Sequence, residues 1–160
     1  MEPLAVGIHS VSTLAQVRAN YVVAVFGAGP VGLLCMATAK ALGARRIIAI
    51  DINQERLDFA KKYAATDIFL PGPLKEGEAR IDYSRRTAQE MKDKLGLADT
   101  GANGIDTVIE ASGAEVCIQT GYFAVKSGGT FIQVGMGAPN VQIPIVLMLV
   151  KELVIKGSFR

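Results

Sequence analysis

The sequence has few of the side chains that bind metals or form disulfides. Its 160 residues include one histidine, His9, and two cysteines, Cys35 and Cys117, which lie far apart and outside any C-x-x-C pair. Ordinary metal sites take three or four such ligands, and disulfide frameworks need several cysteines. The chain therefore cannot build a metal site of the usual ligand count from these residues, and we expect both cysteines to be buried, unreactive thiols.

An excess of charge of one sign and long apolar runs are also missing. The 17 Lys and Arg residues and the 15 Asp and Glu residues are interspersed and leave a net charge of +2, which disfavours a nucleic-acid partner. The most apolar run, 143–150, is interrupted by Pro144 and followed by Lys151, so we expect no membrane segment. The first four residues lack the charged and apolar regions of a signal peptide, so we expect a soluble, cytoplasmic protein.

The dominant motif is a glycine-rich turn that follows an apolar strand. The β-branched run 22–26 leads directly into the G-x-G-x-x-G pattern of residues 27–32. Gly27 would make the tight turn, Gly29 would let the backbone approach a pyrophosphate, and Gly32 would let the next helix pack against the strand. The phosphates would then lie at the N-terminus of that helix, where unpaired N–H groups and the positive end of the helix dipole attract anions.

An acidic residue at the end of the second strand supports the same interpretation. Strand 46–50 ends at Asp51, 19 positions beyond Gly32, where the adenosine ribose of a dinucleotide arrives. A carboxylate there accepts hydrogen bonds from the ribose hydroxyls and repels a 2′-phosphate, which favours NAD over NADP. Arg56 would reach the ribose or a phosphate from the next helix; the alternative is a solvated surface arginine.

Apolar strands and helical segments alternate along the whole chain. This alternation predicts an α/β fold, a doubly wound six-stranded parallel sheet of the Rossmann type in the strand order 3-2-1-4-5-6. Ligands bind such sheets at the carboxyl ends of strands 1 and 4, so residues 27–32, 111–113 and 134–136 should surround one crevice. The expected strands are 22–26, 46–50, 67–70, 105–110, 130–134 and 153–156. A polar loop is expected over 71–83, and a helix capped by Ser84 should follow it.

Four segments together resemble a known family. Residues 2–9, 26–32, 110–115 and 156–160 are similar, in the same order, to the polyol branch of the medium-chain zinc-dependent dehydrogenases, which includes sorbitol and xylitol dehydrogenases. The similarity covers essentially the whole chain. It implies a cofactor-binding domain whose parent enzyme takes NAD and zinc, oxidises a small-molecule polyol to a ketose, and forms homo-oligomers.

The resemblance also assigns roles to individual residues. It places Glu2 beside the catalytic zinc, as a ligand or through a water, and places Arg160 with it among the catalytic residues. Two further groups would bind the cofactor. On the adenosine and phosphate side these are Gly27, Gly29, Val31, Gly32, Asp51 and Arg56, and on the nicotinamide side Val134, Gly135, Met136, Ser158 and Phe159.

The chain departs from the family because the domain that carries most zinc ligands is absent from it. We therefore expect residues 1–20 to be a lead-in segment and 21–160 to be the NAD-binding domain of a fragment that is inactive alone. One alternative is a free-standing NAD-binding module with a regulatory or partner-binding role. Another is an S-adenosylmethionine-dependent methyltransferase, which shares the glycine-rich turn and the acidic residue, although Pro30 and Gly32 disfavour it.

Overall fold

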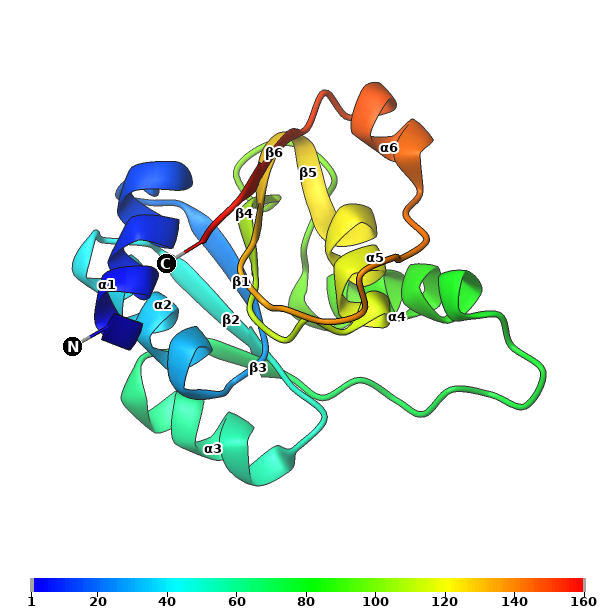
Figure 1. The fold of residues 1–160 in the computed structure, drawn as a ribbon, viewed down its shortest axis with the longest axis horizontal. Coiled ribbons are helices and arrows are strands. Elements are labelled where there is room, and N and C mark those ends of the chain that lie inside the picture. Colours follow the sequence, from blue (N-terminus) through cyan, green and yellow to red (C-terminus); the bar gives the residue numbers. More distant parts are fainter. Residues whose placement is uncertain (1, 160) are drawn as a thin grey trace.

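The computed structural model describes residues 2–159 and contains one sheet of six parallel strands (Figure 1). The strand order is β3-β2-β1-β4-β5-β6, which confirms the predicted doubly wound topology. β1 lies at the centre, and all five of its residues are buried because helices cover both faces of the sheet. The strands are β1 (Val22–Phe26), β2 (Arg46–Ile50), β3 (Asp67–Phe69), β4 (Ile105–Glu110), β5 (Val125–Gln133) and β6 (Val154–Gly157).

The helices divide between the two faces of the sheet, as Figure 1 shows. Val23 and Val25 of β1 pack with η1, α2 and α3 on one face, whereas Val22, Ala24 and Phe26 pack with α4 and α5 on the other. No helix within residues 2–159 has the length and apolar content needed to cross a bilayer. The helices are α1 (Glu2–Ile8), the π-helix η1 (His9–Leu14), α2 (Pro30–Ala41), α3 (Gln54–Tyr63), α4 (Arg80–Leu95), α5 (Glu115–Ala124) and α6 (Ile145–Val150).

The N-terminal residues pack onto the same core as the sheet. Val11, Ala15 and Val17 are buried in the cluster that contains α2 and α3. The Ser10 hydroxyl donates a 2.9 Å hydrogen bond to the Ser158 hydroxyl, and Lys156 Nζ donates to the Leu14 carbonyl at 2.9 Å. The first and last segments of the chain are therefore fixed to each other.

Two predicted boundaries are wrong by several residues, and the ends of the predicted strands 67–70, 130–134 and 153–156 differ from β3, β5 and β6 by one residue. α4 begins at Arg80, four residues before the predicted cap, because Ser84 is buried inside the helix. Its hydroxyl bonds the Arg80 carbonyl at 2.8 Å and Gln119 Oε1 on α5 at 2.9 Å. β5 begins at Val125 rather than at Thr130, and it passes through an irregular register against β4. Both differences arise from contacts with other elements, which local sequence patterns do not report.

Candidate functional site

An open cleft crosses the carboxyl ends of the strands and contains two adjoining chambers. The Asp51 chamber has a volume of about 370 Å³, and the Glu2 chamber has a volume of about 500 Å³. Ala111 and Ser112, which directly follow β4, line both chambers. The Asp51 chamber is further lined by Gly27, Gly29, Ile50, Asp51, Ile52, Arg56, Pro71, Ala114, Val116 and Cys117, and the Glu2 chamber by Glu2, Val6, Val31, Val134, Gly135, Met136, Ser158 and Phe159.

The glycine-rich turn has the geometry that its sequence predicts. Gly27 adopts a φ of +93°, which L side chains rarely adopt, as the tight turn requires. A Cβ on Gly32 would lie 1.8 Å from the Gly27 carbonyl oxygen, so only glycine lets α2 begin so close to β1. A Cβ on Gly29 would meet nothing within 4 Å. Gly29 therefore faces open space at the N-terminus of α2, and Pro30 is the first residue of that helix.

Asp51 lies at the end of β2 and is held by two backbone amides. Its Oδ2 accepts a 2.8 Å hydrogen bond from the amide of Ala28, and its Oδ1 accepts a 2.9 Å bond from the amide of Asn53. Asn53 caps α3, as its sequence position predicts, by accepting from the Arg56 amide at 3.0 Å. The exposed Arg56 side chain lies at the same chamber as the Asp51 carboxylate.

The Glu2 chamber is built from segments distant in sequence. Val31 comes from the start of α2, residues 134–136 follow β5, and Ser158 and Phe159 follow β6. Ser158 is fixed by its bond to Ser10 and by its amide, which donates to the Gln133 carbonyl at 2.8 Å. Met136 is 90% exposed and Phe159 is 79% exposed, so the chamber offers an open apolar wall.

Nearly all the predicted cofactor residues thus meet at this cleft. Gly32 lies behind the turn and lines neither chamber, and Arg160 lies outside the described residues. Sequence reasoning missed Val6, Pro71 and Cys117. These residues reach the cleft only through the packing of α1, the loop after β3 and α5, and no local pattern marks them.

Both cysteines are free but differ in exposure. Cys35 is fully buried in α2, as expected, whereas Cys117 is only partly buried and lines the Asp51 chamber. Burial raises the pKa of the Cys35 thiol to about 12 and that of the Cys117 thiol to about 11. Neither thiol is therefore a nucleophile at neutral pH.

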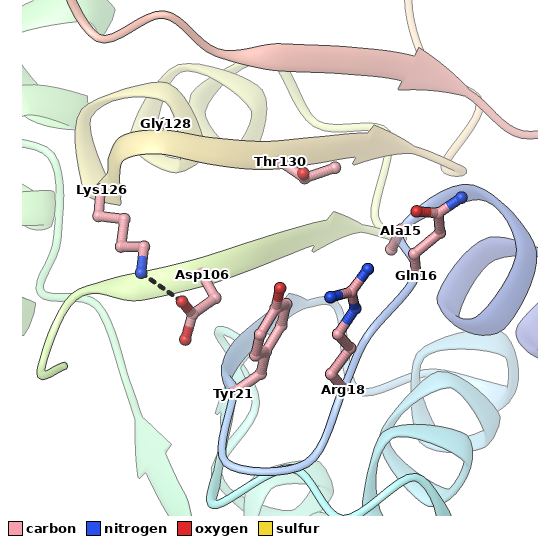
Figure 2. Close-up of a pocket in the computed structure, with 8 residues that line it drawn as sticks. All are labelled: Ala15, Gln16, Arg18, Tyr21, Asp106, Lys126, Gly128 and Thr130. Carbon is pink, nitrogen blue, oxygen red and sulfur yellow. Dashed lines mark hydrogen bonds and ion pairs between the residues drawn. The ribbon is translucent and has the colours of Figure 1, made fainter. Parts of the chain in front are cut away.

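A second cavity, of about 220 Å³, lies near the starts of β1 and β4, away from the cleft (Figure 2). Lys126 points at Asp106 and forms an ion pair with it, as Figure 2 shows. The other oxygen of Asp106 accepts from the amide of Val22 at 2.7 Å. The acidic group of this cavity is therefore already paired with groups of the chain, and none of residues 27–32 lines the cavity.

The described residues do not form a complete zinc site. Within residues 2–159, no group of three His, Cys, Asp or Glu side chains lies close enough together to hold a metal ion. Glu2 is an exposed residue of α1 at its chamber, while His9 lies in η1, outside the residues that line either chamber. The described part of the chain therefore offers fewer than three ligands to a metal at any one place.

Comparisons with known proteins find dehydrogenases that are similar to this chain in sequence and in fold. The chain is 47% identical over 160 residues to "D-xylulose reductase A" from Aspergillus niger, covering 100% of this chain and 41% of that protein. It superposes on 2R,3R-butanediol dehydrogenase from Bacillus subtilis with a TM-score of 0.79 and 26% identity, covering 99% and 40% of the two chains. A zinc-binding dehydrogenase from Sinorhizobium meliloti, described as putative and bound to NADP, gives a TM-score of 0.76 and 26% identity, covering 98% and 42%.

The family profile described as "Zinc-binding dehydrogenase" matches residues 30–160, most of the chain. The match includes the helix that follows the glycine-rich turn, together with every strand after β1. The chain spans 41% of the length of the curated relatives that it matches. On the profile, the relatives and the fold together, the chain belongs to the zinc-binding dehydrogenases.

Proposed function

We propose that the cleft binds NAD, with the adenosine half in the Asp51 chamber and the nicotinamide half in the Glu2 chamber. The observation that carries the proposal is Gly29, which faces open space and lines the same chamber as Asp51 and Ser112. A pyrophosphate there would reach the first-turn amides of α2, a 12-residue helix whose dipole favours anions. The two chambers would then take the two halves of one dinucleotide.

The Asp51 carboxylate supports NAD rather than NADP. An ionised carboxylate has about four lone-pair sites, and the backbone amides of Ala28 and Asn53 use two of them. The remaining lone pairs would accept hydrogen bonds from the ribose hydroxyls, whereas a 2′-phosphate would meet a like charge. Ile52, the next residue, is 84% exposed and offers no positive charge to a phosphate. Arg56 would contact the ribose or a phosphate from α3.

For the whole protein we propose a zinc-dependent polyol dehydrogenase that oxidises a secondary alcohol of a sugar alcohol to a ketose and transfers hydride to NAD. Support comes from D-xylulose reductases that are 46–49% identical over the full length of this chain. Zinc, when bound, would activate the substrate hydroxyl. Glu2 would supply the one zinc contact from the described residues. Val134–Met136 and Phe159 would hold the nicotinamide ring.

Self-association is part of the proposal. α6 has no buried residue, and its sequence is entirely apolar. Val146, Leu149 and Val150 are 66%, 75% and 66% exposed. β6 beside it is an edge strand of the sheet. Such an apolar surface next to an open edge is typical of an interface, so we propose that this surface joins two copies of the protein.

We also propose a cytoplasmic location, where free thiols persist.

Calorimetric titrations with NAD and with S-adenosylmethionine test the cofactor class. We expect saturable binding of NAD and none of S-adenosylmethionine. Arg56→Ala should weaken NAD binding by roughly threefold to tenfold, while Arg18→Ala, the matched exposed arginine at the other cavity, should leave it unchanged. Binding of S-adenosylmethionine alone, or no binding by a folded protein, would contradict the proposal. Residues 1–160 alone should bind NAD without oxidising xylitol, since residues 2–159 contain no zinc-ligand set.

A further inference from the structure

A buried carboxylate lies at the end of β4, directly beneath the cleft. Glu110 is 0% exposed, and its hydrogen-bond partners in the described chain are neutral donors. Oε1 accepts from the Ser112 amide at 2.9 Å, from the Ser112 hydroxyl and from the Gly113 amide at 3.0 Å. Oε2 accepts from the same Gly113 amide at 3.0 Å and from Gln133 Nε2 at 2.8 Å. A buried charge is costly, so these donors must stabilise it.

These donors belong to two segments that form the walls of the Glu2 chamber. Ser112 lines the chamber on the β4 side, and Gly135 lines it on the β5 side. Gln133 Nε2 bridges the two, because it donates both to Glu110 and, at 2.7 Å, to the Gly135 carbonyl. The Glu110 backbone carbonyl also accepts from the amides of Val134 and Gly135, each at 2.8 Å. One residue thus holds both walls through its side chain and its backbone.

The two walls also touch backbone to backbone. A Cβ on Gly135 would lie 2.2 Å from the Gly113 amide nitrogen and 2.8 Å from Glu110 Oε2, and a Cβ on Gly137 would lie 1.8 Å from the Gly113 carbonyl oxygen. Gly113 itself has a φ of +76°. The segments therefore interlock around the Glu110 carboxylate, and a shift of one wall requires a shift of the other.

We propose that Glu110 is a positioning residue for the nicotinamide half of the cofactor. Its ionised carboxylate sets the spacing of Ser112 and the Val134–Met136 segment, and thereby the width of the chamber in which the ring lies. The inference rests on the proposed function, since it takes the Glu2 chamber as the nicotinamide site. The Asp51 chamber shares Ala111 and Ser112 with the Glu2 chamber, but its polar groups, Asp51 and Arg56, come from the end of β2 and from α3. Adenosine binding should therefore depend on Glu110 less than nicotinamide binding does.

The proposal requires a carboxylate rather than any polar group of the same size. In Glu110→Gln, one oxygen acceptor becomes an NH₂ donor that faces either the Gly113 amide or Gln133 Nε2. Gln133 cannot rotate its amide to compensate without losing its bond to the Gly135 carbonyl. The walls would separate to relieve this contact between donors. A displacement of 1 Å at a reacting centre costs up to about a hundredfold in rate.

The test compares the affinity for NADH with the affinity for ADP-ribose, which has every part of the cofactor except the nicotinamide. In Glu110→Gln, NADH should bind about tenfold more weakly, and its bound fluorescence should shift toward that of free NADH. The affinity for ADP-ribose should fall by clearly less than the affinity for NADH. Gln119→Glu is the matched control, because Gln119 is equally buried but bonds Ser84 and Gln142 away from the cleft. It should change neither affinity.

Equal losses for both ligands, or no loss of NADH affinity, in a folded variant would overturn the proposal. If Glu110→Gln does not fold, Gln133→Leu removes the bridge from Glu110 to the Gly135 carbonyl but leaves the bonds of Glu110 to Ser112 and Gly113. It should give the same selective loss, of smaller size. A protein that binds neither ligand before substitution refutes the proposed function instead, so the two failures are distinguishable.

Discussion

The amide of Ala28 donates a 2.8 Å hydrogen bond to the Asp51 carboxylate. This bond joins the middle of the glycine-rich turn to the end of the neighbouring strand. Asp51 therefore has two roles: it fixes the shape of the turn, and it lines the Asp51 chamber with lone pairs that remain free to accept hydrogen bonds. The bond couples the phosphate side of the proposed site to its ribose side. A substitution of Ala28 or of Asp51 should therefore affect both sides of the site.

Two glycines of the same turn should respond differently to substitution by alanine. Gly32→Ala places a Cβ 1.8 Å from the Gly27 carbonyl, and we expect a loss of about 2 kcal/mol or more in the free energy of unfolding. Gly29→Ala meets no atom within 4 Å, so the stability should change by less than about 0.5 kcal/mol. Its methyl group would instead occupy the phosphate position and weaken NAD binding by roughly tenfold. Thermal unfolding measures the stability of both variants, and calorimetry measures their affinity for NAD. A Gly32→Ala variant that is as stable as the unmodified protein would refute the steric argument.

The loop before α4 should be held by a pH-dependent clamp. The Arg86 guanidinium bonds both oxygens of Glu78 at 2.8 Å, and the Lys75 amide adds a third bond. These bonds lower the pKa of Glu78 from 4.5 to about 2. Because the folded pKa is lowered, the stabilisation is complete above 4.5 and is lost as the pH falls toward 2.

The measurement is the midpoint temperature of unfolding of Glu78→Gln and of the unmodified protein, from neutral pH down to the pKa of about 2. The unmodified protein should be more stable at neutral pH, and the difference should shrink as the pH falls below 4.5. Glu76→Gln, an exposed glutamate in the same loop, is the control and should show no such difference. A gap between Glu78→Gln and the unmodified protein that stays constant with pH would argue against the clamp.

Neither cysteine should react with iodoacetamide at pH 7. The pKa of Cys117 is raised to about 11 and that of Cys35 to about 12 by burial, so almost no thiolate is present. Intact-mass measurements should show labelling of Cys117 only as the pH approaches that range, and labelling of Cys35 only after unfolding. Rapid labelling of the folded protein at neutral pH would show that the thiols are activated.

The apolar surface of α6 should mediate self-association. Leu149 is 75% exposed, so Leu149→Asp should lower the mass seen by analytical ultracentrifugation while changing stability by less than about 0.5 kcal/mol. Leu74→Asp, in the loop before α4 and 52% exposed, is the control for added charge. If Leu74→Asp dissociates the assembly equally, or Leu149→Asp does not dissociate it, the interface lies elsewhere.

Much of the fold could be predicted from the sequence, for a physical reason. The glycines of the turn, the apolar strands and Asp51 carry their structural requirements locally, so their spacing indicated the sheet order and the cleft. The start of α4 could not be predicted, because Ser84 bonds Gln119 on another helix and is therefore satisfied inside α4 rather than at its end. Ser84 is buried because the helices pack together, and this burial cannot be recognised from the types of the residues next to it in the sequence.

The site was predictable to the same extent. Residues of the turn and of the strand ends follow from the rule that ligands bind at the carboxyl ends of strands. Pro71 and Val6 lie at the cleft through long-range packing only. Glu110 was recognisable as the end of a strand, but its role needs the positions of Gln133 and Gly113, which only the folded chain brings together.

Parallel calorimetric titrations with NAD and NADP decide whether this cleft is an NAD site selected by Asp51. The protein should bind NAD at least about tenfold more tightly than NADP. Asp51→Ala should weaken NAD binding and remove the preference, whereas Asp58→Ala, an exposed acid on α3, should change neither. Equal affinity for both cofactors before substitution, or a preference that survives Asp51→Ala, would show that Asp51 does not select the cofactor.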